Sequence, residues 1–160
     1  MGVFDALSIS ATGLTAQRIR MDLIAENLAN INTTSTPQGG PYRRKDAIFA
    51  SLDLGWGYSP GPQPFSNFLT PAALGGKSIQ SRWGTKGVKV VDIVEDTGQP
   101  KMVYQPQHPN ANAQGYVAMP NIDGVSEMVN MISAARAYEA NVTVLSASKS
   151  MMEKALEIGR

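Results

Sequence analysis

The chain contains no cysteine and only one histidine, His108. The lack of cysteine excludes disulfides, thiolate metal sites, iron–sulfur clusters and cysteine nucleophiles. The lone histidine excludes a metal centre built from several histidines of one chain. Charge is also sparse, because only 17% of residues are charged and the net charge is +1. A balance this close to zero argues against a dedicated nucleic-acid-binding protein, which carries a clear basic excess.

Long apolar runs are missing as well. No run approaches the roughly 18 residues of a membrane-spanning helix. The first residues, Met1 to Asp5, have no basic segment leading into an apolar stretch. We therefore expect neither a transmembrane segment nor a cleaved signal peptide.

Residues 3–32 have no proline and are rich in Ala, Leu and Ile. Apolar residues recur every seven positions from Leu7 to Leu28, and Ile24 lies three residues after Met21. This spacing is an a/d heptad pattern. This pattern predicts a long helix that ends near residues 30–32, where turn formers and then Pro37 follow. The expected seam of this helix, which we predict to be a subunit interface, consists of Leu7, Leu14, Met21, Ile24 and Leu28.

Residues 122–158 carry a second apolar stripe with alternating spacings of three and four. Asp123 or Ser126 can cap its start, and Gly159 lies where a helix should stop. The expected interface seam of this second long helix consists of Met131, Ala135, Tyr138, Val142, Leu145 and Met152. The opposite face is predicted to carry polar residues that include Glu127 and Asn141.

The middle of the chain has β-type patterning. Residues 47–50 predict one strand, and residues 88–94 and 102–104 predict a hairpin around the turn formers at 96–100. Between them, residues 53–86 form a Gly- and Pro-rich stretch that we interpret as a functional or exposed insertion. The predicted fold class is α+β, with two long terminal helices that pair in a coiled-coil-like manner while the β- and loop-rich middle projects sideways.

The two helices have narrow seams and Ala-rich outer faces. We therefore hypothesise that both ends are loosely ordered in the free chain and fold against other subunits. The alternative is that each amphipathic helix packs on the core of its own chain.

No pattern assigns a catalytic, cofactor-binding or metal-binding residue. Residues Gly75 to Ser78 resemble part of a phosphate-binding loop, but Pro71 stands where its first glycine belongs. Asp92, Glu95 and Asp96 could form a carboxylate pair, but at a turn they are expected to be solvated or to cap it. His108 has no candidate nucleophile placed by any motif, and the basic cluster 43–45 favours a salt contact with protein or a solvated face. No cofactor is expected.

Three ordered motifs carry a family resemblance. The first is Asn27, Ala29, Asn30 and Thr33, which resembles the Asn-x-Ala-Asn-x-x-Thr signature of bacterial flagellar rod and hook proteins. The second is Gly40, Pro41, Tyr42 and Arg43, which is similar to a stretch of the proximal rod members. The third comprises His108, Pro109, Gly115, Tyr116, Pro120 and Asn121, followed by the block 127–141. The resemblance covers residues 1–50 and 88–160.

The resemblance implies a structural subunit of the proximal rod in the periplasmic part of the flagellar basal body. Such subunits are exported by the flagellar type III apparatus without a cleaved signal and assemble helically into a hollow drive shaft that transmits torque and encloses the export channel. The implied division is a rod core domain from 1–36 and 122–160, with a middle domain at 37–121. Implied partners are further copies, FlgB-like, FlgF-like and FlgG-like rod proteins, and the FliE adaptor that leads to the MS ring.

Three other interpretations remain open from the residues. The chain could be another rod subunit at a different axial position, an amphipathic membrane-surface or secreted protein, or an enzyme without a recognisable constellation. Within the first motif, Asn27, Asn30 and Thr33 are expected to cap the first helix and direct its exit. The alternative is a local cap that faces solvent and has no partner.

Overall fold

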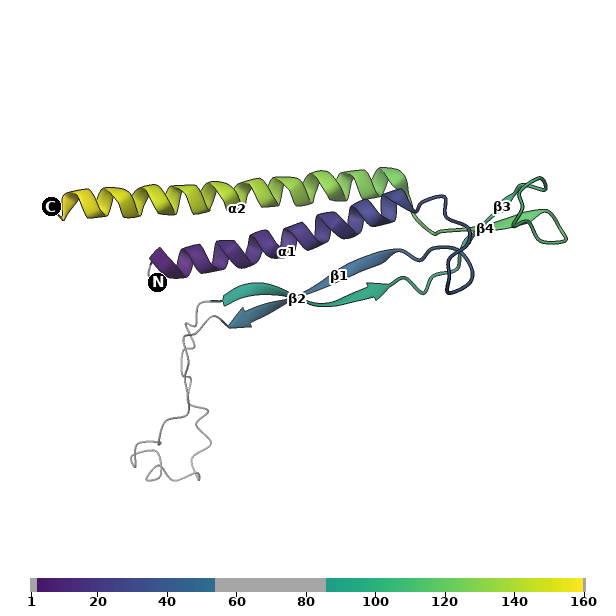
Figure 1. Cartoon of the computed structure of the whole chain (residues 1–160), viewed down its shortest axis with the longest axis horizontal. Coiled ribbons are helices and arrows are strands. Elements are labelled where there is room, and N and C mark those ends of the chain that lie inside the picture. Colours follow the sequence, from purple (N-terminus) through teal and green to yellow (C-terminus); the bar gives the residue numbers. More distant parts are fainter. Residues whose placement is uncertain (1–2, 54–85, 160) are drawn as a thin grey trace, which may run out of the picture.

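The computed structural model describes residues 3–53 and 86–159. The Gly- and Pro-rich insertion, with the glycine-rich segment at 75–78, therefore lies outside the described residues except at its ends. The described elements are α1 (Val3–Ala29), β1 (Lys45–Asp53), β2 (Lys86–Glu95), β3 (Lys101–Tyr104), β4 (Tyr116–Met119) and α2 (Gly124–Ile158). These elements confirm the predicted α+β class with two long terminal helices (Figure 1).

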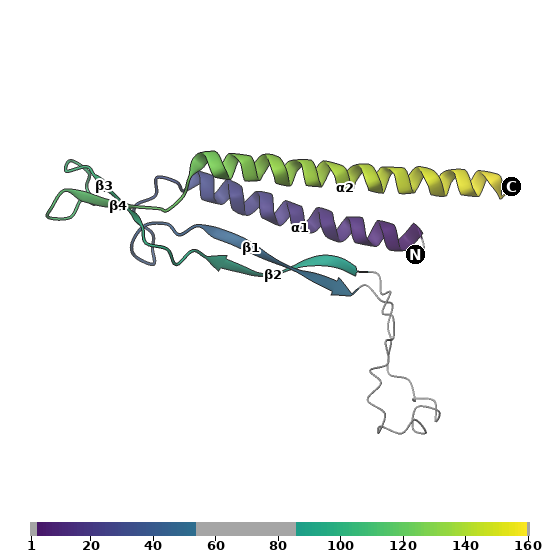
Figure 2. The same cartoon turned by 180° about the vertical axis from the view of Figure 1, so that it is seen from behind.

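The two helices lie side by side and antiparallel in both views (Figures 1 and 2). Gly124, at the start of α2, faces Leu28 in the last turn of α1 and Ile31 just after it. Toward the other end of α1, Gly13 faces Asn141 of α2. Asp123 caps α2 as expected, since its carboxylate accepts hydrogen bonds from the Ser126 amide at 3.3 Å and hydroxyl at 2.7 Å. These bonds to Ser126 lower the pKa of Asp123.

The closest row of α2 against α1 is made of small or polar residues rather than the predicted apolar ones. Glu127, Ala134 and Ser148 are buried at heptad spacing, and Asn141 continues the same row. The expected outward placement of Glu127 and Asn141 was therefore wrong. Small side chains occupy the central row because they let the two helix axes approach closely. Longer side chains pack along the edges of the contact between the helices.

Most of the predicted seam residues are partly or fully covered by the rest of the chain. Ile24 is buried, and Val142 is 43% exposed. The remaining members are half-buried, namely Leu7, Leu14, Met21, Leu28, Met131, Ala135, Tyr138, Leu145 and Met152.

The strands form two separate two-stranded antiparallel sheets, β1–β2 and β3–β4. In the first sheet Lys45 pairs with Glu95 and Asp53 with Lys86, with a register irregularity at Ile48/Phe49. The predicted hairpin of 88–94 with 102–104 was therefore wrong, although both strands exist. The turn at 96–100 does form a local bond from the Gly98 amide to Asp96 at 2.8 Å, but β2 is already paired along its whole length with β1.

The β1–β2 sheet lies against α1, on the side away from α2, so α1 is the middle layer of the body (Figures 1 and 2). One anchor of this packing is the Val88 amide, which donates to the Thr12 hydroxyl at 3.2 Å. The β3–β4 sheet alone extends beyond the end of the helix pair. The expectation that the whole middle projects sideways was therefore wrong, because one sheet supplies a cover for α1.

Gly13 lies where α1 approaches the Asn141 side chain of α2 closely. A Cβ at this position would lie 2.9 Å from the Asn141 amide nitrogen. We expect Gly13→Leu to lower the free energy of unfolding by about 1–3 kcal/mol through overpacking. Urea unfolding followed by circular dichroism measures the change, and Ala11→Leu on the exposed face of α1 is the control. Adding Asn141→Ala should recover part of the loss; no recovery would contradict the contact.

Candidate functional site

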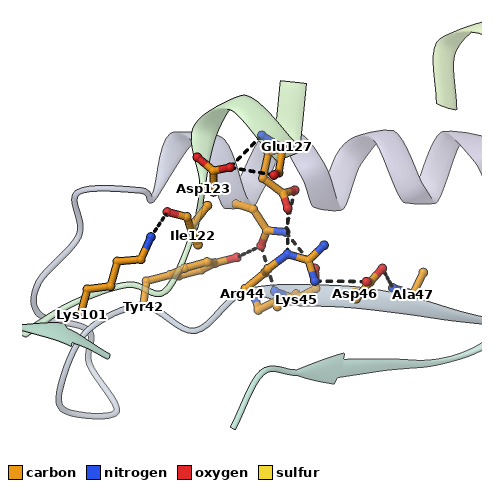
Figure 3. A network of polar contacts seen from close by, with 11 residues as sticks. Tyr42, Arg44, Lys45, Asp46, Ala47, Lys101, Ile122, Asp123 and Glu127 are labelled. Atoms are coloured by element: carbon orange, nitrogen blue, oxygen red, sulfur yellow. Dashed lines mark hydrogen bonds and ion pairs between the residues drawn. The ribbon is translucent and has the colours of Figure 1, made fainter. Parts of the chain in front are cut away.

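Buried polar groups gather where the end of α1, the start of β1 and the first turn of α2 meet. Figure 3 shows Tyr42, Arg44 and Lys45 lying next to one another below Glu127. We call this cluster the polar junction and define it as Glu26, Asn27, Tyr42, Arg44, Lys45 and Glu127. It ties together three segments that are far apart in the sequence.

Asn27 is the centre of the polar junction and is fully buried. Its side-chain amide pairs with the backbone of Lys45 on both sides, accepting from the N–H at 2.9 Å and donating to the carbonyl at 2.8 Å. The Asn27 oxygen also accepts from the Tyr42 hydroxyl at 3.1 Å, and its nitrogen lies 3.4 Å from a Glu127 oxygen. Asn27 therefore substitutes for a neighbouring strand beside β1 and is neither a helix cap nor a solvent-facing residue.

Glu127 is held by Arg44. The Arg44 Nε donates to a Glu127 oxygen at 2.7 Å, and the Glu127 side chain is only 3% exposed. This bond raises the pKa of Arg44, whose guanidinium also contacts Asp46 at 3.1 Å. A buried carboxylate is costly without a partner, so this pair makes the position of β1 depend on that of α2.

Tyr42 and Lys45 complete the junction on the side of α1. The Lys45 ammonium lies 2.6 Å from Glu26 and 5.6 Å from the centre of the Tyr42 ring. Burial, with the nearby negative charge of Glu26 as the second cause, raises the pKa of Tyr42 from 10.0 to about 12. The phenol therefore stays protonated and keeps donating to Asn27.

The rest of the first motif shapes the exit from α1. The Asn30 amide donates to the Glu26 carbonyl at 2.9 Å, which confirms the expected C-terminal cap. The Thr33 hydroxyl donates to the Asn30 side chain at 3.1 Å, and the Thr33 carbonyl accepts from the Tyr42 amide at 3.0 Å. These bonds return the chain from α1 toward β1.

The other motif residues divide between the junction loop and the β3–β4 sheet. Gly40 has a φ of +80°, which suits its turn, while Ala29 and Arg43 are exposed. Gly115, also at +80°, precedes Tyr116, whose ring packs edge-on against Tyr104 at 5.3 Å. The remaining members precede β4 (His108 and Pro109) or follow it toward α2 (Pro120 and Asn121).

Sequence reasoning missed that Arg44, Lys45 and Glu127 belong to one cluster. The basic stretch 43–45 was expected to meet protein or to be solvated; Arg44 and Lys45 meet carboxylates of their own chain, and Arg43 is exposed. A usable signal did exist, because Glu127, Ala134, Asn141 and Ser148 repeat every seven residues. That row is not apolar, so a search for hydrophobic periodicity passes over it.

The junction borders an open groove of about 510 Å³, which is lined mainly by the loop after α1 and also by Glu26, Lys45 and Glu95. Within residues 3–53 and 86–159, no three His, Asp or Glu side chains are grouped to hold a metal ion. Neither described helix is apolar enough over its length to cross a membrane. The polar groups of the junction form hydrogen bonds and ion pairs with one another and with the backbone. These bonds hold α1, β1 and α2 in fixed relative positions.

Both ends of the chain match models of one class of protein. Residues 7–35 match the family described as flagella basal body rod protein, and residues 113–158 match the C-terminal family of the flagellar basal body rod FlgEFG proteins. These ranges cover most of each long helix, and the first contains Asn27. The class that these two matches indicate is that of flagellar basal-body rod proteins.

Curated relatives narrow the class further. The flagellar basal-body rod protein FlgC of Borreliella burgdorferi is 44% identical over 162 residues, which cover 99% of this chain and 98% of the relative. FlgC of Bacillus subtilis is also 44% identical, and FlgC of Escherichia coli O157:H7 is 41% identical, each covering 100% of both chains. The chain belongs to the FlgC family of flagellar basal-body rod proteins.

Loss of the Asn27 amide should destabilise the whole junction. We expect Asn27→Ala to lower the free energy of unfolding by about 2–4 kcal/mol, because the Lys45 backbone and the Tyr42 hydroxyl lose their buried partner. Asn32→Ala, at an exposed position in the same turn, is the control and should cost less than about 0.5 kcal/mol. Equal effects in urea unfolding would contradict the central role of Asn27.

Tyr42 should make stability depend on alkaline pH. Its pKa is about 12 in the folded chain and 10.0 in the unfolded one, so folding retains the proton. The stabilisation is therefore complete below pH 10 and is lost as the pH rises toward 12. We expect the stability difference between the wild type and Tyr42→Phe to shrink across this range in urea unfolding. A constant difference would contradict the buried phenol.

Proposed function

We propose that this chain is a non-enzymatic structural subunit of the flagellar basal-body rod, and of its proximal part in particular. The observation that carries the proposal is the similarity to FlgC proteins over the full length of both chains. A protein of another function that had only one domain in common with FlgC proteins would be similar to them over that domain alone. Here both helices and the strands between them fall within the shared length.

The architecture suits a subunit that transmits force. α1 and α2 are 27 and 35 residues long, and they lie against each other for most of the length of α1. The polar junction locks one end of this pair to β1, so a force on the sheet is passed to both helices. Stiffness of this kind supports the transmission of torque through a helical, hollow shaft whose bore passes exported chains.

The finer assignments follow from the same proposal. Residues 1–36 and 122–160 form the rod core domain, and residues 37–121 form the middle domain. The seam residues, although largely covered within their own chain, present their remaining exposed surface at subunit interfaces. The neighbours are further copies, FlgB-like, FlgF-like and FlgG-like subunits, and the FliE adaptor toward the MS ring. The chain reaches the periplasmic rod through the type III export apparatus.

Rod incorporation tests the proposal directly. In cells that lack their own copy, we expect the wild-type chain to restore swimming and to be recovered in purified basal bodies. Leu145→Asp should abolish both, because the charge opens the half-buried margin between α1 and α2. Ala147→Asp, an exposed position two residues away, is the matched control and should behave as the wild type.

Immunoblots of whole cells must show equal amounts of each variant, so that loss from the basal body is not loss of the chain. The absence of the wild-type chain from basal bodies that are otherwise complete would overturn the proposed function.

A further inference from the structure

The outer face of α2 carries an apolar stripe that its own chain does not cover. Val125, Met128, Val129 and Ile132 have the spacing i, i+3, i+4, i+7 and are 55–71% exposed. This is the spacing by which a helix offers anchors to another helix. The same face continues through Arg136, Glu139 and Val142. We call these seven residues the α2 outer row.

The α2 outer row lies on the side of the helix away from Glu127, Ala134 and Ser148, which face α1. α1 has a corresponding outer face with a different composition. Its exposed residues alternate at spacings of three and four and are mostly small; this α1 outer row consists of Ser8, Ala11, Thr15, Arg18, Asp22, Ala25 and Ala29. It lies away from Gly13, Leu28 and Ile31, which face α2.

The two rows fit each other when two copies lie parallel. The α2 outer row of one copy then runs antiparallel to the α1 outer row of the next, as the helices do within one chain. Met128 falls opposite Ala29 and Ile132 opposite Ala25, so large apolar side chains meet small ones.

The charges agree with the same register. One turn further on, Arg136 falls opposite Asp22, and Glu139 falls opposite Arg18. None of these four side chains has an ion-pair partner among residues 3–53 and 86–159. Two opposite-charge pairs therefore follow two large-to-small contacts at the spacing of a single helix face.

We propose that the α2 outer row of one copy packs against the α1 outer row of a second copy in this register. The inference rests on the proposed function and deepens it by naming the contacting surfaces. The α1 outer row lies on a flank of α1 that neither α2 nor the β1–β2 sheet covers, and the α2 outer row lies on a different face of the body. Because the two rows are different surfaces, the contact is heterologous, and each copy can bind one neighbour through each row. Copies are then added side by side without the contact closing as a dimer.

Charge reversal tests the register in cells. We expect Asp22→Arg or Arg136→Asp alone to lower recovery in basal bodies at least about tenfold, since each places like charges together. The double variant should return recovery to near the wild-type level. Asp92→Arg, on an exposed position of β2, is the control for the added charge. Rescue of Asp22→Arg by Lys149→Asp instead would overturn the proposal, because the copies would then be offset along the helices.

Disulfide crosslinking tests the contact itself. Because the chain has no native cysteine, every disulfide must come from the introduced residues. Full chains of two sizes, one with Ala25→Cys and one with Ile132→Cys, should form a mixed disulfide on oxidation. Ser8→Cys with Ile132→Cys is the control, since Ser8 lies about 25 Å along α1 from Ala25. A chain that carries both Ala25→Cys and Ile132→Cys should give a ladder of multimers, because the contact is heterologous.

These outcomes separate the contact from the proposed function. If single reversals enter basal bodies as well as the wild type, or if the control pair crosslinks equally, the contact is wrong while rod membership stands. If the wild type is absent from basal bodies, the proposed function fails, and the crosslinks between purified chains still decide the contact. Multimers that stop at the dimer would overturn the heterologous arrangement.

Discussion

A single buried amide holds the parts of this protein together. The Asn27 side chain completes the hydrogen bonds of β1, receives the Tyr42 hydroxyl and reaches Glu127 at the start of α2. Glu127 in turn is neutralised by Arg44, which directly precedes the strand that Asn27 holds. Asn27, Tyr42 and Glu127 are buried, and their polar groups bond to one another, to Arg44 and to the backbone, so the removal of one leaves others unsatisfied. The relative position of helices and sheet therefore depends on this contact.

The remaining structure follows from that fixed end. From the junction outward, α1 lies between α2 and the β1–β2 sheet (Figure 1). The helices stay close through a row of small and polar residues, Gly13 against Asn141 being one contact. The larger apolar residues then lie at the margins or on the outside, where part of their surface remains exposed. The chain therefore leaves apolar surface of α2 and of β2 uncovered.

The extent of the helices and most strands could be predicted because their signals are local. Alternating spacings of three and four, the Asp123 cap and the turn formers after Asn30 act within a few residues of one another. The inward face of α2 could not be predicted by hydrophobicity, since its central row holds Glu127, Asn141 and Ser148. The strand pairing was missed because β1 finds its partner across a long insertion, whereas the nearer turn suggested a local hairpin.

The sequence by itself determined the fold class, the two long helices, the family motifs and the lack of thiol chemistry, since these depend on composition and short-range pattern. Only the tertiary structure decided which faces are buried, that Asn27 acts as a strand neighbour and that Arg44 pairs with Glu127, 83 residues away. Such contacts depend on distances between segments that the chain brings together only on folding. For the same reason, the outer rows of α1 and α2 became visible as free surfaces only when their inner faces were known.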